Sequence, residues 1–115
     1  MKNIKNLTSA LKAFEEAANM HALATEQGDY KSANKNYDIV VKIITYLKDN
    51  NAIDKLLIFL NNPSIGVRMA AATYLLPKYE NEGLKTLDDI RNSKGIHSLT
   101  ASTIINEWEN GNLKL

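Results

Sequence analysis

Apolar residues recur at steps of three and four in two long stretches of the first half of the chain. The first series consists of Leu7, Leu11, Phe14, Ala18, Ala22 and Thr25, and the second of Tyr30, Ala33, Tyr37, Val40, Val41, Ile44 and Leu47. Because an α-helix completes a turn every 3.6 residues, this spacing predicts two amphipathic helices. We expect Thr8 or Ser9 to cap the first helix. Gly28 should end it and Asp29 should cap the second, which gives a hairpin with almost no loop.

Shorter amphipathic segments fill the second half of the chain. Cap-forming residues mark their expected starts, at Asn51, Ser64, Asn81 and Ser98. Pro77 is expected to end the fourth helix and Gly111 the sixth. No linker of more than a few residues interrupts the pattern, so it predicts one domain over residues 1–115 with six helices in three antiparallel hairpins.

The second and third hairpins match each other at an offset of thirty residues. The matching pairs are Leu57 with Leu87, Leu60 with Ile90, Ala71 with Ala101, and Leu75 with Ile105. In stacked helical repeats each hairpin exposes an apolar face that its neighbour covers. The offset therefore predicts a short stack of repeated hairpins.

The stretch from Leu56 to Leu75, LLIFLNNPSIGVRMAAATYL, resembles a HEAT repeat. It has a leucine-rich first helix, a turn with Pro63, and a Val-Arg pair followed by alanines in the second helix. Asn61 and Asn62 stand where an Asp commonly partners the Arg, so the turn departs from the usual HEAT pattern.

The stretch 28–37, GDYKSANKNY, resembles the second helix of a tetratricopeptide repeat, with its Gly-x-Tyr, small and aromatic positions. Together the two segments make the chain similar to a small bacterial HEAT-like family, domain of unknown function 2019. The resemblance implies an all-α fold, a right-handed α-α superhelix of the HEAT or armadillo type. It also implies an interaction scaffold and brings no catalytic residues.

Composition and charge limit the classes of partner. Apolar residues make up 44% of the chain and charged residues 23%, as in ordinary soluble domains. The formal net charge is +1, so no global field attracts nucleic acid, anionic lipid or acidic substrates. Cysteine is absent, which excludes disulfides and thiolate metal sites. The first seven residues lack the apolar stretch of a signal peptide and no run is long enough to span a membrane, so we expect a cytoplasmic protein.

No pattern in the sequence indicates catalysis. His21 and His97 are far apart and neither lies in a metal-binding motif; we interpret His21 as a hydrogen-bonded core residue and His97 as a loop residue. Acidic neighbours such as Asp88 and Asp89 point about 100° apart on a helix and are interpreted as solvated faces. The serines fall at helix starts, where capping explains them, so they do not indicate a nucleophile. The five glycines are scattered singly, so they form no glycine-rich phosphate-binding loop. We therefore expect no enzyme, no cofactor and no metal ion.

Arg68 and Trp108 are interpreted as structural residues. Arg68 belongs to the HEAT-like Val-Arg pair, so we expect it to bond turn carbonyls or a carboxylate. Trp108 shares the apolar face of the last helix with Ile104 and Ile105, so we expect it in the core.

A mostly basic ridge follows the polar side of the second predicted helix. Its members are Lys31, Lys35, Asp38, Lys42 and Thr45, at steps of four, three, four and three. Every amphipathic helix needs a polar face; the functional interpretation is that this ridge steers an acidic protein partner. We expect the second helices of successive hairpins to lie side by side and to present a partner-binding surface made of Lys35, Asp38, Lys42, Met69, Thr73, Thr103 and Asn106.

The predicted function is a non-catalytic protein-protein interaction module whose partner carries an acidic patch. An adaptor fits this prediction, and so does an inhibitor or immunity protein for a bacterial toxin; the residues do not separate the two. The alternative is a nucleic-acid-binding HEAT-like domain, against which the near-neutral charge argues. The sequence leaves the oligomeric state open.

Overall fold

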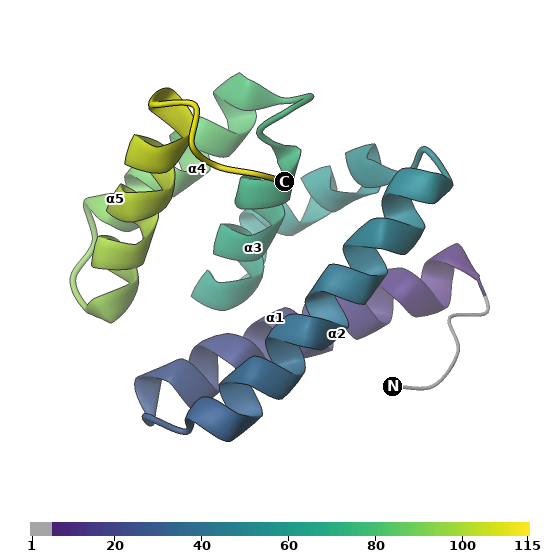
Figure 1. Ribbon diagram of the computed structural model, residues 1–115, viewed down its shortest axis with the longest axis horizontal. Helices are drawn as coiled ribbons and strands as arrows, with labels where there is room; N and C mark the ends of the chain where they lie inside the picture. The colour runs from purple at the N-terminus through teal and green to yellow at the C-terminus, as the bar shows by residue number, and fades with distance from the viewer. Residues whose placement is uncertain (1–5) are drawn as a thin grey trace.

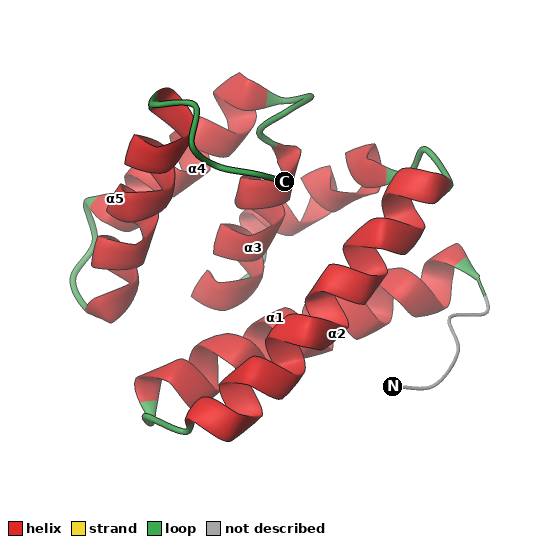
Figure 2. Cartoon of the chain, viewed as in Figure 1, coloured by secondary structure: helices red, strands yellow, loops and turns green. Residues whose placement is uncertain are grey.

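Six helices, joined by short loops, make up most of the molecule (Figures 1 and 2). The structure, a computed structural model, describes residues 6–115; the first five, where the sequence predicts no signal peptide, lie outside it. The helices are, in order, α1 (Leu7–Glu26), α2 (Tyr30–Asp49), the 3-10 helix η1 (Ile53–Asn61), α3 (Ile65–Leu75), α4 (Glu80–Arg91) and α5 (Ile96–Glu109). Residues 6–115 contain no strand, and consecutive helices pack together, which confirms the predicted all-α class. None of these helices has the length and apolar character needed to cross a membrane.

The first hairpin turns where the sequence predicts it. Helices α1 and α2 pack against each other over most of their lengths (Figure 1). Gly28 has a φ of +71°, a left-handed conformation that costs glycine little. The Asp29 side chain accepts a hydrogen bond from the Ser32 amide at 3.1 Å and so caps α2.

The start of α1 lies earlier than predicted. The cap is neither Thr8 nor Ser9: the Asn6 side chain accepts a hydrogen bond from the Ser9 amide at 2.8 Å. With Asn6 as the cap, Leu7 becomes the first helical residue and packs against the core. The partial burial of Leu7 thus favours Asn6 over Thr8 and Ser9 as the cap.

The third helix is a 3-10 helix, and its predicted cap is wrong. Asn51 does not cap it; this residue instead has a φ of +53°, and η1 begins at Ile53 with no side-chain cap. Its buried residues are Ile53, Leu56 and Phe59, at a strict spacing of three. A 3-10 helix has 3.0 residues per turn, so this spacing places all three on one side.

The later helices begin partly where predicted. Ser64 caps α3 by accepting the Val67 amide at 3.3 Å, as expected. The predicted cap Asn81 lies inside α4, which begins at Glu80. Helix α5 begins at Ile96, not at Ser98, whose hydroxyl donates to the Arg91 carbonyl and so ties α5 to the end of α4.

Helix α3 is the centre of the packing and contacts η1, α4 and α1. One core cluster joins α1, α2, η1 and α3, and a second joins α3, α4 and α5; Leu60 packs against both. The repeat-related Ala71 and Ala101 are both fully buried, whereas Leu57 and Leu60 are half-buried and their counterparts Leu87 and Ile90 are buried. The chain ends with Leu113 and Leu115 packed against the second cluster.

Two glycines let helices approach α3 closely. A Cβ atom on Gly66 of α3 would lie 2.4 Å from the Ala22 Cβ and 2.8 Å from the Ala18 carbonyl oxygen of α1. A Cβ atom on Gly83 of α4 would lie 2.7 Å from the Ala72 carbonyl oxygen of α3. These contacts are closer than side chains tolerate, so α1 and α4 both lie against the α3 backbone itself.

Candidate functional site

A pocket of about 240 Å³ opens where α1, α2, α3 and α5 meet. Its apolar lining comes from all four helices: Ala18, Ala22, Val40, Gly66, Met69, Ala70 and Ile104. Its polar lining consists of His21, Thr25, Tyr37, Thr73, Tyr74, His97 and Thr100. The pocket is the main apolar concavity of the molecule, and it brings together two histidines that are 76 positions apart in the chain (97 − 21).

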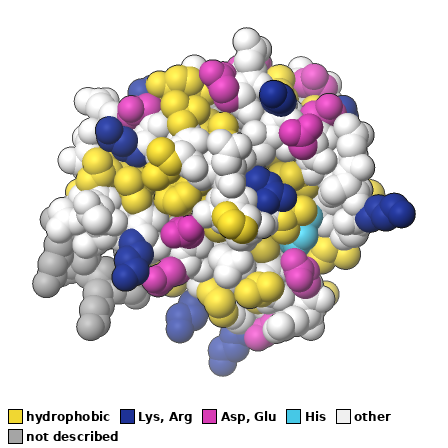
Figure 3. Space-filling view, turned by 180° about the vertical axis from the view of Figure 1, so that it is seen from behind, with side chains coloured by type: hydrophobic (Ala, Val, Ile, Leu, Met, Phe, Trp, Pro, Cys, Tyr) yellow, Lys and Arg dark blue, Asp and Glu magenta, His cyan; other side chains and the backbone are white. Residues whose placement is uncertain are grey.

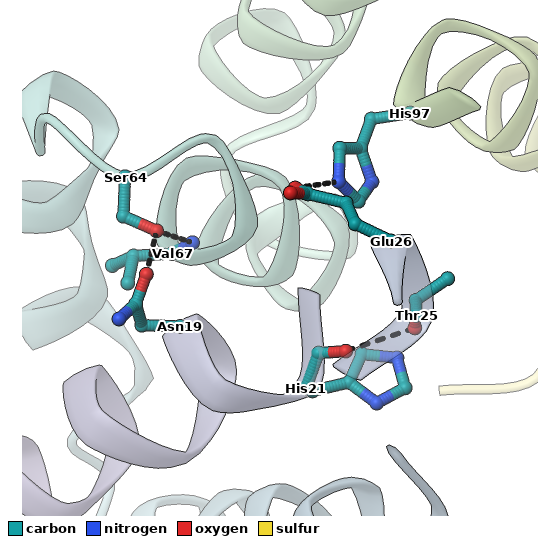
Figure 4. Close-up of polar contacts among 7 residues, drawn as sticks. All are labelled: Asn19, His21, Thr25, Glu26, Ser64, Val67 and His97. Atoms are coloured by element: carbon teal, nitrogen blue, oxygen red, sulfur yellow. Dashed lines mark hydrogen bonds and ion pairs between the residues drawn. The ribbon is translucent and has the colours of Figure 1, made fainter. Parts of the chain in front are cut away.

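One wall of the pocket is held by hydrogen bonds between α1 and the turn before α3. The Ser64 hydroxyl donates to the Asn19 side-chain oxygen at 2.8 Å while it also caps α3 (Figure 4). The Asn62 side-chain amide donates to Glu15 Oε2 at 2.6 Å. Together with the close approach at Gly66, these bonds fix the position of α1 on α3.

His21 is a half-buried, hydrogen-bonded residue, as the sequence predicts. Its Nδ1 lies 2.9 Å from the Ala33 carbonyl oxygen of α2. A carbonyl oxygen can only accept, so Nδ1 carries the proton and Nε2 of the neutral ring keeps a lone pair. The His21 carbonyl in turn accepts the Thr25 hydroxyl at 2.8 Å (Figure 4).

His97 is buried in the first turn of α5, so its interpretation as a loop residue is wrong. Its ring is only 7% exposed and its Nε2 lies 2.8 Å from Glu26 Oε2, near the end of α1 (Figure 4). The left-handed φ of Gly95, +114°, turns the chain so that the helix starts one residue before His97. The pair joins the first hairpin to the third, and His97 also lines the pocket.

Two tyrosines stand side by side in the pocket, one from α2 and one from α3. Burial, followed by charge repulsion and hydrogen bonding with Tyr37, raises the pKa of Tyr74 to about 12. Tyr74 is therefore neutral at physiological pH. The Tyr37 ring also lies against the His21 ring, with centroids 5.9 Å apart.

The structure distributes the seven predicted partner-binding residues over three helices. Met69 and Thr73 of α3 line the pocket and are half-buried. The others are exposed: Lys35, Asp38 and Lys42 on α2, and Thr103 and Asn106 on α5. The expected side-by-side order of second helices differs from the structure, because α1 rather than α2 is the main neighbour of α3 in the first hairpin. The close contact at Gly66 explains why α1 takes this place.

The basic ridge is exposed along its length. Lys35 and Lys42 are two and five positions from Tyr37, so helix geometry turns them away from the pocket side of α2. From behind, the surface shows charged side chains of both signs between hydrophobic patches (Figure 3). The ridge is a local basic feature of a chain whose formal net charge is only +1.

The other residues singled out by the sequence have structural contacts. Arg68 Nη1 donates to the Asn62 and Pro63 carbonyl oxygens at 2.7 and 3.1 Å, which confirms the predicted bonds to the turn. Trp108 is half-buried against the second core cluster, and its Nε1 donates to Glu80 Oε2 at 2.7 Å. Among residues 6–115 no three His, Asp or Glu side chains gather closely enough to hold a metal ion.

Sequence reasoning did not find the pocket. Its polar residues lie on four helices, so no local motif unites them. A signal does exist in part: Ala18 and Ala22 are small residues at helical spacing, and Gly66 is a small residue near the start of another predicted helix, which favours a close crossing. Nothing in the sequence pairs His97 with Glu26, because 71 positions separate them.

Comparison with known proteins identifies no relative of this chain. The resemblances to HEAT and tetratricopeptide repeats thus depend on the residues quoted above. No family model, no curated protein and no solved structure matches this chain.

Proposed function

We propose that this chain is a non-catalytic, cytoplasmic interaction module that binds a protein partner on the face around the pocket. The observation that carries the proposal is the pocket itself, a mostly apolar concavity bordered by exposed apolar side chains. On α2, Tyr30 is 77% exposed, and Tyr37 and Val41 lie on the same side of the helix. On α5, Ile96 is 48% exposed and lies on the same side of the helix as the lining residue Thr100.

Exposed apolar groups around a concavity favour a binding face. Apolar side chains scattered singly on a surface need no explanation, but a contiguous apolar area with a polar rim is typical of interaction sites. Here exposed apolar side chains lie beside the pocket on two different helices, and the ridge with Lys35 and Lys42 follows the adjoining solvent side of α2. This arrangement supports a protein partner that combines an apolar contact with an acidic patch.

The ridge contributes to the encounter rather than to the stability of the complex. Exposed charges mainly change the association rate and its dependence on salt. An adaptor and an inhibitor or immunity protein for a bacterial toxin both remain within this proposal, since each requires only a face that a partner covers.

The test uses charge-reversed variants to capture partners and to measure their association rates. Partners are captured from extracts of the source cell with the wild-type protein and with a Lys35→Glu/Lys42→Glu variant. We expect a protein that the wild type captures and that associates with the variant about tenfold more slowly at low salt, with little difference at high salt. A Lys12→Glu/Lys55→Glu variant, with the same change in net charge on exposed residues of α1 and η1, should associate as the wild type does.

Two outcomes contradict the proposal. An association rate that is unchanged in the ridge variant shows that the partner binds elsewhere. Capture of nucleic acid, with an equilibrium constant that falls steeply with salt, favours the alternative of a nucleic-acid-binding domain.

A further inference from the structure

The hydrogen atoms of several polar groups in the pocket are already bound to protein acceptors. The Thr25 hydroxyl donates to the His21 carbonyl at 2.8 Å, and the Thr73 hydroxyl donates to the Met69 carbonyl at 2.7 Å. His21 donates from Nδ1 to the Ala33 carbonyl. These groups can offer a ligand only lone pairs.

Both imidazoles therefore keep an open acceptor when they are neutral. His97 bonds the Glu26 carboxylate through Nε2, which leaves the lone pair on Nδ1, whereas His21 keeps its lone pair on Nε2. Among residues 6–115, every buried side-chain nitrogen or oxygen that solvent cannot reach has a hydrogen-bond partner. Since no group within this part of the chain bonds either open nitrogen, solvent reaches both. The Tyr37 and Tyr74 hydroxyls can each donate and accept a hydrogen bond. They therefore leave the surplus of acceptors in the pocket unchanged.

The rest of the lining disfavours a charged ligand. The seven other lining residues are apolar, no described lining residue is acidic, and Glu26, the carboxylate that meets the lining residue His97, is already bound to it. A buried ammonium or guanidinium group needs a counter-charge, which this pocket does not offer. The fitting ligand is therefore neutral, apolar in its body, and a hydrogen-bond donor.

We propose that the pocket receives a tryptophan side chain of the protein partner, whose indole N–H donates to one of the two open imidazole nitrogens. Tryptophan is the uncharged side chain that donates a hydrogen bond without also accepting one. The volume of about 240 Å³ is below the ~300–1,000 Å³ typical of small-molecule sites, which suits a single large side chain. Tryptophan is also enriched among the residues that dominate binding energy at protein interfaces. The proposal depends on the proposed function, because it names the anchor of that partner.

The test uses two probes of the same shape in solution. N-acetyl-tryptophanamide is titrated into the isotope-labelled protein and followed by NMR, next to its benzothiophene analogue, in which sulfur replaces the N–H. We expect the tryptophan probe to shift signals of residues that line the pocket, with a dissociation constant in the millimolar range. It should bind about threefold to tenfold more tightly than the analogue, which is the net worth of one hydrogen bond.

A pair of variants locates the binding. Thr100 is exposed at the pocket rim, so Thr100→Phe should fill the opening and weaken the probe at least about tenfold without unfolding the protein. Thr8→Phe, at an exposed position of α1 outside the lining, should leave binding unchanged. Long-range proton–nitrogen spectra should show the neutral rings protonated at Nδ1 in His21 and at Nε2 in His97.

The proposal is overturned by any of three results: equal binding of the two probes, an undiminished affinity in Thr100→Phe, or no shifts at probe concentrations of about 10 mM. Its failure is separate from that of the proposed function. A protein partner that depends on the ridge, without probe binding, refutes only the tryptophan anchor. Probe binding without any protein partner refutes only the interaction module.

Discussion

Helix α3 meets its neighbours in two different ways. Against α1 it lies backbone to backbone, because Gly66 faces Ala18 and Ala22, and hydrogen bonds from the preceding turn fasten the crossing. Toward α5 the same helix presents Met69 and Thr73, and the two helices contact each other only slightly. The pocket occupies the space between them. The comparison teaches that small residues let α1 pack tightly against one side of α3, which we call the closed side. Larger, partly polar residues line a pocket on the other side, toward α5, which we call the open side.

The largest loss of stability is expected from a substitution that separates α1 from α3. A Gly66→Ala substitution places a methyl group 2.4 Å from the Ala22 Cβ and 2.8 Å from a backbone oxygen, so α1 must move. We expect a loss of about 2–3 kcal/mol in the free energy of unfolding, even though alanine favours helices by about 1 kcal/mol over glycine. Urea denaturation followed by circular dichroism measures it.

A second substitution checks that the close crossing causes this loss. Ala22→Gly removes the nearest atom, so the double variant should recover part of the stability, although the Ala18 carbonyl oxygen still lies 2.8 Å away. If the double variant is no more stable than Gly66→Ala, contact with the Ala22 methyl group does not cause the loss. The two sides of α3 would then differ less in packing.

The next effect concerns the hydrogen bonds on the closed side. Ser64→Ala removes both the cap of α3 and the bond to Asn19, so we expect a loss of about 1–2 kcal/mol. Asn19→Ala removes only the second bond and should cost less. Equal losses in the two variants would mean that the cap contributes nothing beyond the link to α1.

Tyr74 gives a pH dependence. Its pKa is raised from 10.0 to about 12 in the folded protein, so between these values the unfolded chain releases a proton that the folded one keeps. Stability should therefore fall as the pH rises from 10 to 12, by on the order of 1–2 kcal/mol from this residue. Unfolding of Tyr74→Phe across the same range should show a shallower fall. Parallel curves for the two proteins would contradict the burial of this hydroxyl.

The smallest effect is expected on the open side. Glu26→Ala removes the partner of His97, but Glu26 is largely exposed and water can replace it, so we expect a loss of about 0.5–1 kcal/mol. A thermal unfolding series with Ser64→Ala as reference measures the difference. A larger loss than that of Ser64→Ala would reverse the ranking of the two sides of α3.

Local signals in the sequence predict much of the fold. Gly28, Asp29 and Ser64 act as expected because turns and caps depend on a few neighbouring residues. The spacing of three at Ile53, Leu56 and Phe59 is visible in the sequence too, where the pattern predicts an amphipathic helix without specifying the 3-10 type. The 3-10 geometry could have been inferred from this spacing, since an α-helix turns these positions progressively apart.

The site could not be predicted in the same way. The sequence predicts the cap of α5 at Ser98, a residue type that caps well, whereas the structure has it three residues earlier, at the left-handed turn of Gly95. His97 thereby moves from a loop into the first helical turn and becomes buried. Its pairing with Glu26 depends on how α1 and α5 lie in space, which no short motif encodes.

The bond between His97 and Glu26 also bears on the order of folding. Most contacts of this molecule join consecutive helices, and such local contacts form early because they close short loops. The bond spans 71 positions and requires α1, α3 and α5 to be in place already. We therefore expect the pocket to be the last region to assemble and, in the native state, the first to open, so that amides at the start of α5 exchange with solvent faster than those of α3.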